Sequence, residues 1–464
     1  MDGTLVHTDM LFEAYVKLLK KRPWVAFETL LWLKQGRAYL KRQISQDVTF
    51  LPNVLPYNKE LVAWLQAERA KGRQLYLATA SDSLLAEIVA EHLGIFDRII
   101  ASNGQKNLSG KDKAAALVEV CGEKQFDYAG NSRADLPVWV KARRAIVVNA
   151  RQQLIQEVTR IAPVERVFPR KYPLTVPVFL KAIRVRQWVK NLLLFVPLLT
   201  AHQLADEQLL WQALLGFLAF SLTASGVYLF NDLMDLEADR QHPLKKYRPL
   251  AVGQLTIPAA AVSMAGLLMV SVVLSAFLAP WFYAVLGTYI IINLGYCLYF
   301  KQTTFVDVVI LSFFYVLRLV AGSVATGVPI SHWLLSFAAL VFISLALVKR
   351  TSELINLAQQ NKSKAVGRGY SNHDHKLLIR VGTLTGYLSL VVLSFYITSP
   401  KVVQLYSHPY ILWFLIPLFF LWITHVWNLT RRGKVHEDPT IFALQDAPSY
   451  LIAVSALAVM FLAT

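Results

Sequence analysis

The pattern of apolar and polar positions divides the chain into two parts. In residues 1–165, short apolar runs such as 74–78 and 145–148 alternate with helical stretches such as 58–70 and 84–93. This alternation is typical of a parallel sheet joined by crossover helices. The sequence therefore predicts a soluble α/β domain over residues 1–165.

A connector punctuated by proline and lysine, residues 166–187, leads into a series of long apolar segments. Each segment approaches the ~20 residues that cross a bilayer. The pattern predicts an all-α membrane domain over residues 188–464 with nine transmembrane helices, at 188–205, 209–230, 258–279, 281–300, 305–327, 332–349, 379–398, 409–429 and 443–463.

Basic residues between the segments indicate the orientation. They gather after the second, fourth, sixth and eighth segments, whereas the connectors on the other side hold only Lys401. Because lysine and arginine accumulate in cytoplasmic loops, the N-terminus is expected inside and the span count odd. We expect a protein of the bacterial inner membrane with its N-terminal domain in the cytoplasm.

Composition agrees with a membrane protein. Hydrophobic residues make up 55% of the 464 residues and charged residues 17%, against about 25% charged in soluble domains. The net charge of +17 follows the loop pattern and forms no basic domain, so nucleic acid is not an expected partner. Cys121 and Cys297 lie in different predicted domains and suggest no disulfide framework.

The connector after the second segment carries an acidic motif that begins at Asn231. If this stretch is helical, Asp232, Asp235 and Asp239 fall at i, i+3 and i+7 on one face. Three converging carboxylates would repel one another unless a cation lay between them, and Mg²⁺ is the natural choice. The alternative is a solvated acidic helix start, but acidic residues at the bilayer edge are usually functional.

The same connector continues with the cations Arg240, Lys245, Lys246 and Arg248. Cations so close to the carboxylates would complement a phosphate-rich ligand. The alternative is that they only set the membrane topology, and both effects are expected to operate.

These motifs resemble a known family. The pattern Asn-Asp-x-x-Asp-x-x-x-Asp resembles the first aspartate-rich motif of the UbiA prenyltransferase superfamily. The continuation Asp-Arg-x-His-Pro-x-Lys-x-x-Arg-Pro-x-Ala-x-Gly is similar to the branch that contains decaprenyl-phosphate phosphoribosyltransferases and fusions of a HAD domain to a UbiA domain. The resemblance covers residues 175–464 and implies a UbiA-like, Mg²⁺-dependent membrane transferase.

A second candidate cluster follows the fourth segment. The resemblance implies that Asp307 contributes to a metal site or positions the acceptor, beside Tyr299 and Lys301. Relatives often carry a further aspartate where this chain has Leu311, so this motif alone is not expected to form a complete second metal site. Arg318, about three helical turns after Asp307, should pair with a carboxylate, a phosphate or a backbone carbonyl.

Further candidates lie at predicted helix ends on the cytoplasmic side. They are Lys190, Asn191, Lys349 and Arg350, together with the segment 436–439 before the last predicted span. Each is weak alone, because a cation at a helix end usually reflects topology or the helix dipole.

The N-terminus resembles a HAD phosphatase. Met1-Asp2-Gly3-Thr4 is similar to the end of the Asp-x-Asp-Gly-Thr signature, so Asp2 would be the acid/base and the nucleophilic aspartate would lie immediately before Met1. The resemblance also implies a helical cap, a phosphate-binding hydroxyl at Thr79, a lysine at Lys113 (less favoured, Lys111), and a metal-binding carboxylate at Asp135. Either the start codon is assigned too late, which we favour, or the domain has lost catalysis.

The favoured activity is transfer of a 5-phosphoribosyl group from phosphoribosyl diphosphate to a polyprenyl phosphate, with the soluble domain acting on the product. The runner-up is a prenyltransferase that moves a polyprenyl group from its diphosphate to an aromatic acceptor. A transporter is a distant alternative, because transporter sites tend to lie at the bilayer midplane.

Overall fold

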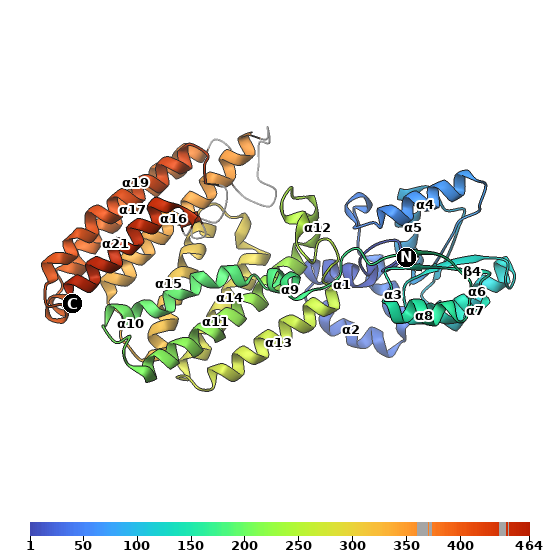
Figure 1. Cartoon of the computed structure of the whole chain (residues 1–464), viewed down its shortest axis with the longest axis horizontal. Helices are drawn as coiled ribbons and strands as arrows, with labels where there is room; N and C mark the ends of the chain where they lie inside the picture. The colour runs from blue at the N-terminus through green and yellow to red at the C-terminus, as the bar shows by residue number, and fades with distance from the viewer. Residues whose placement is uncertain (360–369, 371–373, 436–441, 444) are drawn as a thin grey trace. The chain divides into compact units, whose positions relative to one another are not determined.

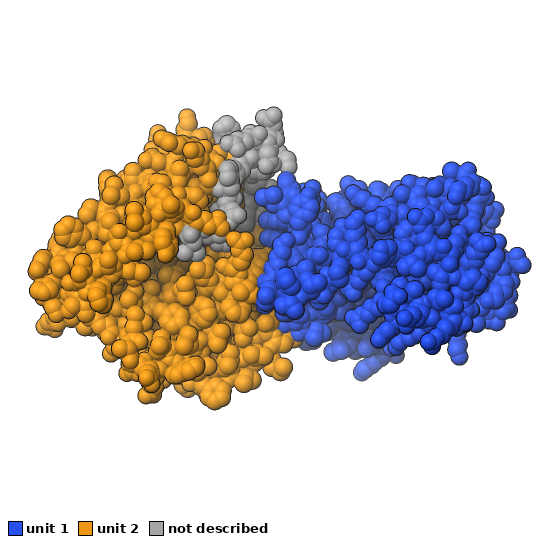
Figure 2. All heavy atoms as spheres, viewed as in Figure 1, with its two compact units in different colours: residues 1–183, 228–264 blue, residues 184–227, 265–464 orange. Residues whose placement is uncertain are grey.

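The computed structural model describes the chain except residues 360–369, 371–373, 436–441 and 444. The described residues form two compact units, which Figure 2 distinguishes by colour. Unit 1 contains residues 1–183 and 228–264, and unit 2 contains residues 184–227 and 265–464. The predicted candidate segment 436–439 lies outside the described residues. The domain boundaries at 165 and 188 remain predictions, since the units divide the chain at other points.

Unit 1 has the predicted α/β character, with parallel strands and covering helices (Figure 1). The strands form two separate sheets among the described residues, so a single HAD-like sheet is not confirmed. One sheet has the order β1-β2 and the other β3-β4-β5. The strands are β1 (Tyr76–Asp82), β2 (Arg98–Ser102), β3 (Asp127–Gly130), β4 (Arg144–Val148) and β5 (Val164–Phe168).

Helices flank the sheets, and four α-helices, α1 to α4, precede β1 in the stretch where a helical cap was expected. Burial of Val6, Leu18 and Leu77 marks one core, and burial of Trp139 and Val147 marks a second. The helices of the N-terminal stretch are α1 (Met10–Lys21), α2 (Val25–Lys34), α3 (Arg37–Gln46), η1 (Pro52–Val54), α4 (Lys59–Ala70), α5 (Ser83–Leu93), α6 (Lys111–Cys121), η2 (Arg133–Asp135), α7 (Leu136–Lys141), α8 (Gln152–Thr159) and α9 (Val176–Ala182).

The aspartate-rich connector also belongs to unit 1. It contains the end of α11 (Glu207–Met234), then α12 (Leu236–Gln241), η4 (Lys245–Tyr247) and the beginning of α13 (Ile257–Ser275). The acidic motif and the N-terminal helices can therefore be described together.

Unit 2 is helical. Besides the remaining parts of α11 and α13, it contains η3 (Val185–Phe195), α10 (Val196–Thr200), α14 (Trp281–Leu298), η5 (Phe300–Gln302), α15 (Val306–Thr326), α16 (His332–Gln359), α17 (His375–Ile397), α18 (Pro400–Leu405), η7 (Pro409–Phe414), α19 (Leu415–Arg431) and α21 (Ala447–Ala463).

The predicted count of nine membrane helices is not confirmed. Among the described residues, seven helices are long and apolar enough to cross a membrane, and the last predicted span is the shorter helix α21. The first predicted span consists of η3 and the short α10. The buried Lys190 and Asn191 interrupt its apolar character, and Pro197 lies in the first turn of the new helix. The seven candidate spans indicate that the chain is an integral membrane protein.

Close packing of η3 on α15 depends on one glycine. A Cβ atom on Gly322 would lie 2.0 Å from the carbonyl oxygen of Leu194. Only a residue without a side chain lets the two backbones approach this closely. Gly322 therefore fixes the position of the segment that carries Lys190 and Asn191.

Candidate functional site

The acidic motif occupies a break between two helices. Asp232 lies in the last turn of α11, Asp235 is the residue before α12, and Asp239 lies within α12. The backbone N–H of Asp235 donates to Asn231, and that of Asp239 donates to Asp235. Helical spacing thus continues through the break, and the side chains of Asp232 and Asp239 are buried.

Arg248 joins two of the three aspartates. Its Nη1 atom lies 3.0 Å from Oδ1 of Asp232 and 2.5 Å from Oδ2 of Asp239. Burial raises the pKa of Asp239, the charge of Asp232 raises it further, and the nearby cations Arg248 and Lys245 oppose the shift. Two buried carboxylates that converge on one cationic nitrogen form a pocket of negative charge suited to a cation.

Asp235 is directed elsewhere. Its Oδ1 atom lies 3.2 Å from Nζ of Lys20 on α1. The described residues contain no group of three or more histidine, cysteine, aspartate or glutamate side chains placed to hold a metal ion. A metal site shared by all three aspartates therefore stays a prediction, and the structure brings together two of them, Asp232 and Asp239.

Helix α1 pairs with α12 along its length. Glu13 binds Arg240 through two hydrogen bonds of 2.6 and 2.9 Å, and both side chains are buried. Lys17 lies 2.7 Å from Glu237 one turn later. With the pair of Lys20 and Asp235, oppositely charged residues face each other in antiparallel order. Arg240 also donates through Nε to the carbonyl of Ala251 and so holds the end of the connector.

Sequence reasoning missed the α1 residues in this arrangement. The available signal was the spacing of Glu13, Lys17 and Lys20 at i, i+4 and i+7, which places them on one helix face. Of the other predicted cations in the connector, Lys245 and Lys246 lie in η4, and Lys246 stacks over the ring of Tyr247.

In unit 2, Asp307 is fully buried at the start of α15. It accepts hydrogen bonds from Nε of Arg350 at 2.5 Å and from the hydroxyl of Tyr370 at 2.6 Å. Arg350 also donates to Tyr296 and Glu353. Asp307 is therefore held by an internal arginine and a tyrosine, and Tyr370 is a partner that no sequence signal pointed to.

The remaining predicted residues near this motif lie at helix ends. Tyr299 follows α14 and is exposed, Lys301 lies in η5, and Lys349 precedes Arg350 in α16. Their roles stay predictions.

Arg318 belongs to a different cluster of unit 2. It donates to Oδ1 of Asn191 at 2.7 Å and to the backbone carbonyl of Phe314, which is one of the partner types expected for it. Its guanidinium also lies over the rings of Phe220, Tyr289 and Tyr315, at 5.2–5.7 Å. Asn191 donates in turn to Ser221, and Lys190 lies over the same Tyr315 ring.

The N-terminal residues of unit 1 form a separate polar cluster. Asp2 accepts a hydrogen bond from the backbone N–H of Met10 and another from the hydroxyl of Ser81. Thr79 is buried in β1 and accepts from the backbone N–H of Ser81. Ser81, which the sequence reasoning missed, is thus the hydroxyl that contacts Asp2.

Lys113 and Asp135, which the resemblance assigns to phosphate and metal binding, form an ion pair with each other. Nζ of Lys113 lies 3.0 Å from Oδ1 of Asp135 and 3.0 Å from the hydroxyl of Tyr128. Burial alone would raise the pKa of Asp135, but Lys113 lowers it below its ordinary value, helped by the hydrogen bond from Tyr128. Asp135 therefore stays charged at neutral pH.

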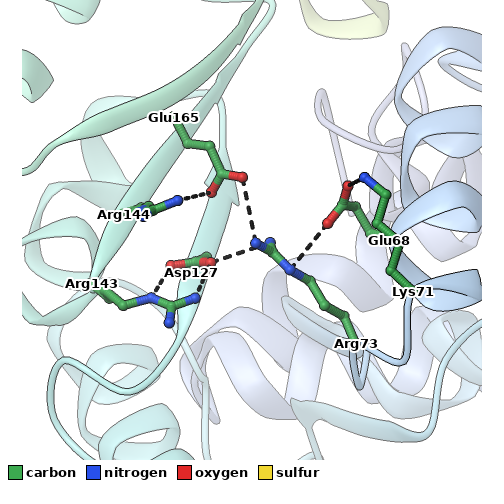
Figure 3. A network of polar contacts seen from close by, with 7 residues as sticks. All are labelled: Glu68, Lys71, Arg73, Asp127, Arg143, Arg144 and Glu165. Carbon is green, nitrogen blue, oxygen red and sulfur yellow. Dashed lines mark hydrogen bonds and ion pairs between the residues drawn. The ribbon is translucent and has the colours of Figure 1, made fainter.

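A cavity of about 550 Å³ separates the two sheets of unit 1. Residues of β1 and β3 line it, helices α4 and α6 contribute apolar side chains, and Met1 lies beside it. Arg73 bridges part of its margin, since it contacts Glu68 on α4 at 3.0 Å and Asp127 on β3 at 3.3 Å (Figure 3). Arg143 binds the same Asp127. Among the described residues, β1 and β3 are end strands of their sheets.

Comparisons with known proteins match both parts of the chain. The model of the haloacid dehalogenase-like hydrolases matches residues 1–139, and that of the UbiA prenyltransferase family matches residues 193–446. A solved UbiA homolog from Archaeoglobus fulgidus bound to GPP and Mg²⁺ is 16% identical, with a TM-score of 0.47, over 62% of this chain and 99% of that one.

Two curated relatives are more similar in sequence. The uncharacterized protein y4nM of Sinorhizobium fredii is 33% identical over 97% of this chain and 88% of that protein. The decaprenyl-phosphate phosphoribosyltransferase of Mycolicibacterium smegmatis is 36% identical over 46% of this chain and 67% of that protein. With its acidic connector and its membrane helices, the chain belongs to the UbiA prenyltransferase family and is a membrane transferase.

Proposed function

We propose that the chain transfers a 5-phosphoribosyl group from phosphoribosyl diphosphate to a polyprenyl phosphate. The observation that carries the proposal is the convergence of Asp232 and Asp239 on Arg248. The phosphoribosyltransferase relative named above supports this choice of substrates over a prenyl diphosphate and an aromatic acceptor.

Asp232 and Asp239 fit a divalent ion because they already hold a cation between them. Mg²⁺ bound there would neutralise the diphosphate and stabilise the charge that develops on the leaving group. Asp235 would join them only after it leaves Lys20, since the two now form an ion pair.

The chain's own cations have a defined task in this proposal. Arg248 can turn from the carboxylates to the diphosphate, because a guanidinium can bind two phosphate oxygens with two parallel hydrogen bonds. Lys245, which acts on Asp239 electrostatically, stands close enough to contribute positive charge at the same place. Arg240 is held by Glu13 and Ala251, so it orders the connector.

Mass analysis of lipid products tests the proposed reaction. The full chain is reconstituted with Mg²⁺, polyprenyl phosphate and phosphoribosyl diphosphate, and in parallel with a polyprenyl diphosphate and an aromatic acid. We expect a phosphoribosylated lipid in the first mixture. A prenylated aromatic product together with no product in the first mixture would reverse the assignment of substrates.

Substitution of the two aspartates tests whether formation of the product depends on the proposed site. Asp232→Asn and Asp239→Asn should each lower the rate by about two orders of magnitude, the usual loss when a group that stabilises transition-state charge is removed. Asp112→Asn, an exposed position on α6, is the matched control. Equal rates in all three variants would contradict the proposed site.

We also propose that the soluble domain removes the 5-phosphate from the lipid product, a task motivated by the fusion of the two domains. Asp2 would act as acid/base, and the nucleophilic aspartate would lie immediately before Met1. The test compares this chain with one extended upstream by a strand that ends in aspartate. A dephosphorylated lipid is expected only from the extended chain, and identical products would rule the task out.

A further inference from the structure

Helix α2 carries its apolar side chains on the outside of unit 1. Five large apolar residues are more than half exposed: Trp24 (57%), Phe27 (77%), Leu30 (63%), Leu31 (59%) and Leu33 (53%). A surface helix of a soluble domain normally presents polar residues to water and buries its apolar stripe. A contiguous apolar face of this kind marks a site of interaction.

The inward face of α2 carries polar groups that have partners. Glu28 accepts hydrogen bonds from Arg22, and Thr29 donates to the carbonyl of Val25 and lies within 3.3 Å of the hydroxyl of Tyr15. Val25 is completely buried, and Trp32 packs against the core. These contacts fix the rotation of the helix, so its outward apolar face is a property of the fold.

Helix α2 begins close to the end of a membrane-spanning helix. Lys20, near the end of α1, donates through Nζ to the backbone carbonyl of Met234 at 2.8 Å. Met234 is the last residue of α11, one of the seven candidate spans. Only the short turn 22–24 separates α1 from α2. The apolar face thus starts within a few residues of a contact with the end of a candidate membrane span.

Exposed cations lie at both ends of the helix. Lys21 precedes α2, Lys34 is its last residue and Arg37 begins α3. Cations flanking an apolar face, with a tryptophan at one end, are typical of helices that lie in a membrane interface. Anionic headgroups would complement these charges, whereas the apolar side chains would enter the acyl region.

We propose that α2 lies on the cytoplasmic surface of the bilayer, with Phe27, Leu30 and Leu31 inserted among anionic lipids. The helix would hold the soluble domain against the membrane, at the level of lipid-linked phosphates. This inference goes beyond the transfer reaction and does not depend on the identity of its substrates.

Depth measurements with a spin label test the proposal on the full chain. The label is attached at Leu30→Cys in a background of Cys121→Ser and Cys297→Ala, in bilayers that contain anionic lipid. We expect collisions with oxygen to exceed collisions with a water-soluble nickel chelate. The control label at Glu87→Cys, exposed on α5, should show the reverse. Both labelled positions are exposed, so neither substitution should disturb the fold.

The contribution of the flanking lysines is tested with the same spin label and bilayers. Lys21→Glu combined with Lys34→Glu should make the label at position 30 shallower in anionic bilayers but not in zwitterionic ones. A label at position 30 as accessible to the nickel chelate as the control would overturn the proposal. Shielding from both reagents would also overturn it, because it would indicate a protein partner or a second copy of the chain.

Discussion

Arg248 places one guanidinium nitrogen between Asp232 and Asp239, so a residue of their own connector offsets part of the charge of these buried carboxylates. Removing one member of a buried ionic group leaves an unpaired charge, which costs more than the group contributed as a whole. At the scale of single residues, the stability of this site should therefore depend on which cation occupies it.

In the absence of divalent ions, Arg248→Met should lower the free energy of unfolding by roughly 2–4 kcal/mol, and the melting temperature with it. Mg²⁺ should restore more stability to this variant than to the parent, because the ion meets no competing guanidinium. Thermal unfolding with and without Mg²⁺ measures both effects. Lys246→Met, in the same connector, is the control, and a Mg²⁺ response no larger than that of the control would contradict the competition.

The carboxyl group of Asp9 should make the free energy of unfolding depend on pH. Burial, aided by the charge of Asp2, raises the pKa of Asp9 to about 6, although its side chain accepts hydrogen bonds from the backbone N–H groups of Leu11 and Phe12. The folded state therefore holds this proton more tightly than the unfolded chain, whose carboxyl titrates near 3.8. The free energy of unfolding should fall as the pH rises from about 4 to about 6.

Asp9→Asn keeps an acceptor at the helix cap and removes the titration. Its unfolding should become less dependent on pH over that window, whereas Asp9→Ala should in addition lose about 1 kcal/mol of capping energy. Denaturant unfolding at several pH values checks both. Unchanged pH dependence in Asp9→Asn would rule out this carboxyl as the source.

At the scale of elements, two ion pairs join α1 to α12, and a third joins α1 to Asp235 directly before α12, in antiparallel order. Exchanging the charges of the buried pair tests the contact between the two helices separately from the folding of each helix. Glu13→Arg and Arg240→Glu should each destabilise the chain by about 3–5 kcal/mol and lower transferase activity. The double variant should recover part of both losses. Gln241→Glu, at an exposed position of α12 outside these pairs, serves as control. A double variant no better than the singles would contradict the coupling.

The packing of η3 on α15 offers a second test at this scale. Gly322→Ala should lower the melting temperature strongly, because the new methyl group would overlap the backbone of Leu194. Gly287→Ala on α14 is the matched control, since no atom lies within 4 Å of its Cβ position. Equal melting temperatures would show that η3 can move away without cost.

Single residues and whole elements differ in how far the sequence alone could predict them. The acidic motif was found because its spacing is local, and the membrane helices were found because each needs only a long apolar run. The first predicted span is not confirmed as one long helix, because Lys190 and Asn191 are buried by partners distant in sequence, Asn191 by Ser221 and Arg318. Glu13 and Tyr370 were missed for the same reason, since their partners lie more than 60 residues away.

At the scale of the whole molecule, two family matches occupy successive parts of one chain, yet the acidic connector of the second packs in one compact unit with the helices of the first. Gly253 takes part in this packing. It has a φ of +80°, and a Cβ atom there would lie 2.1 Å from the carbonyl oxygen of His7. A substitution that displaces His7 should therefore disturb the packing of the connector.

The cavity between β1 and β3 has a consequence for exchange with solvent. Each strand has one edge without a neighbouring strand among the described residues, so its outward amide hydrogens should exchange faster than those of the central strand β4. A chain lengthened upstream by a short apolar segment should slow exchange on β1 and β3 together, because a single inserted strand would hydrogen-bond to both. Slowing on one strand alone would mean that the added segment lies elsewhere.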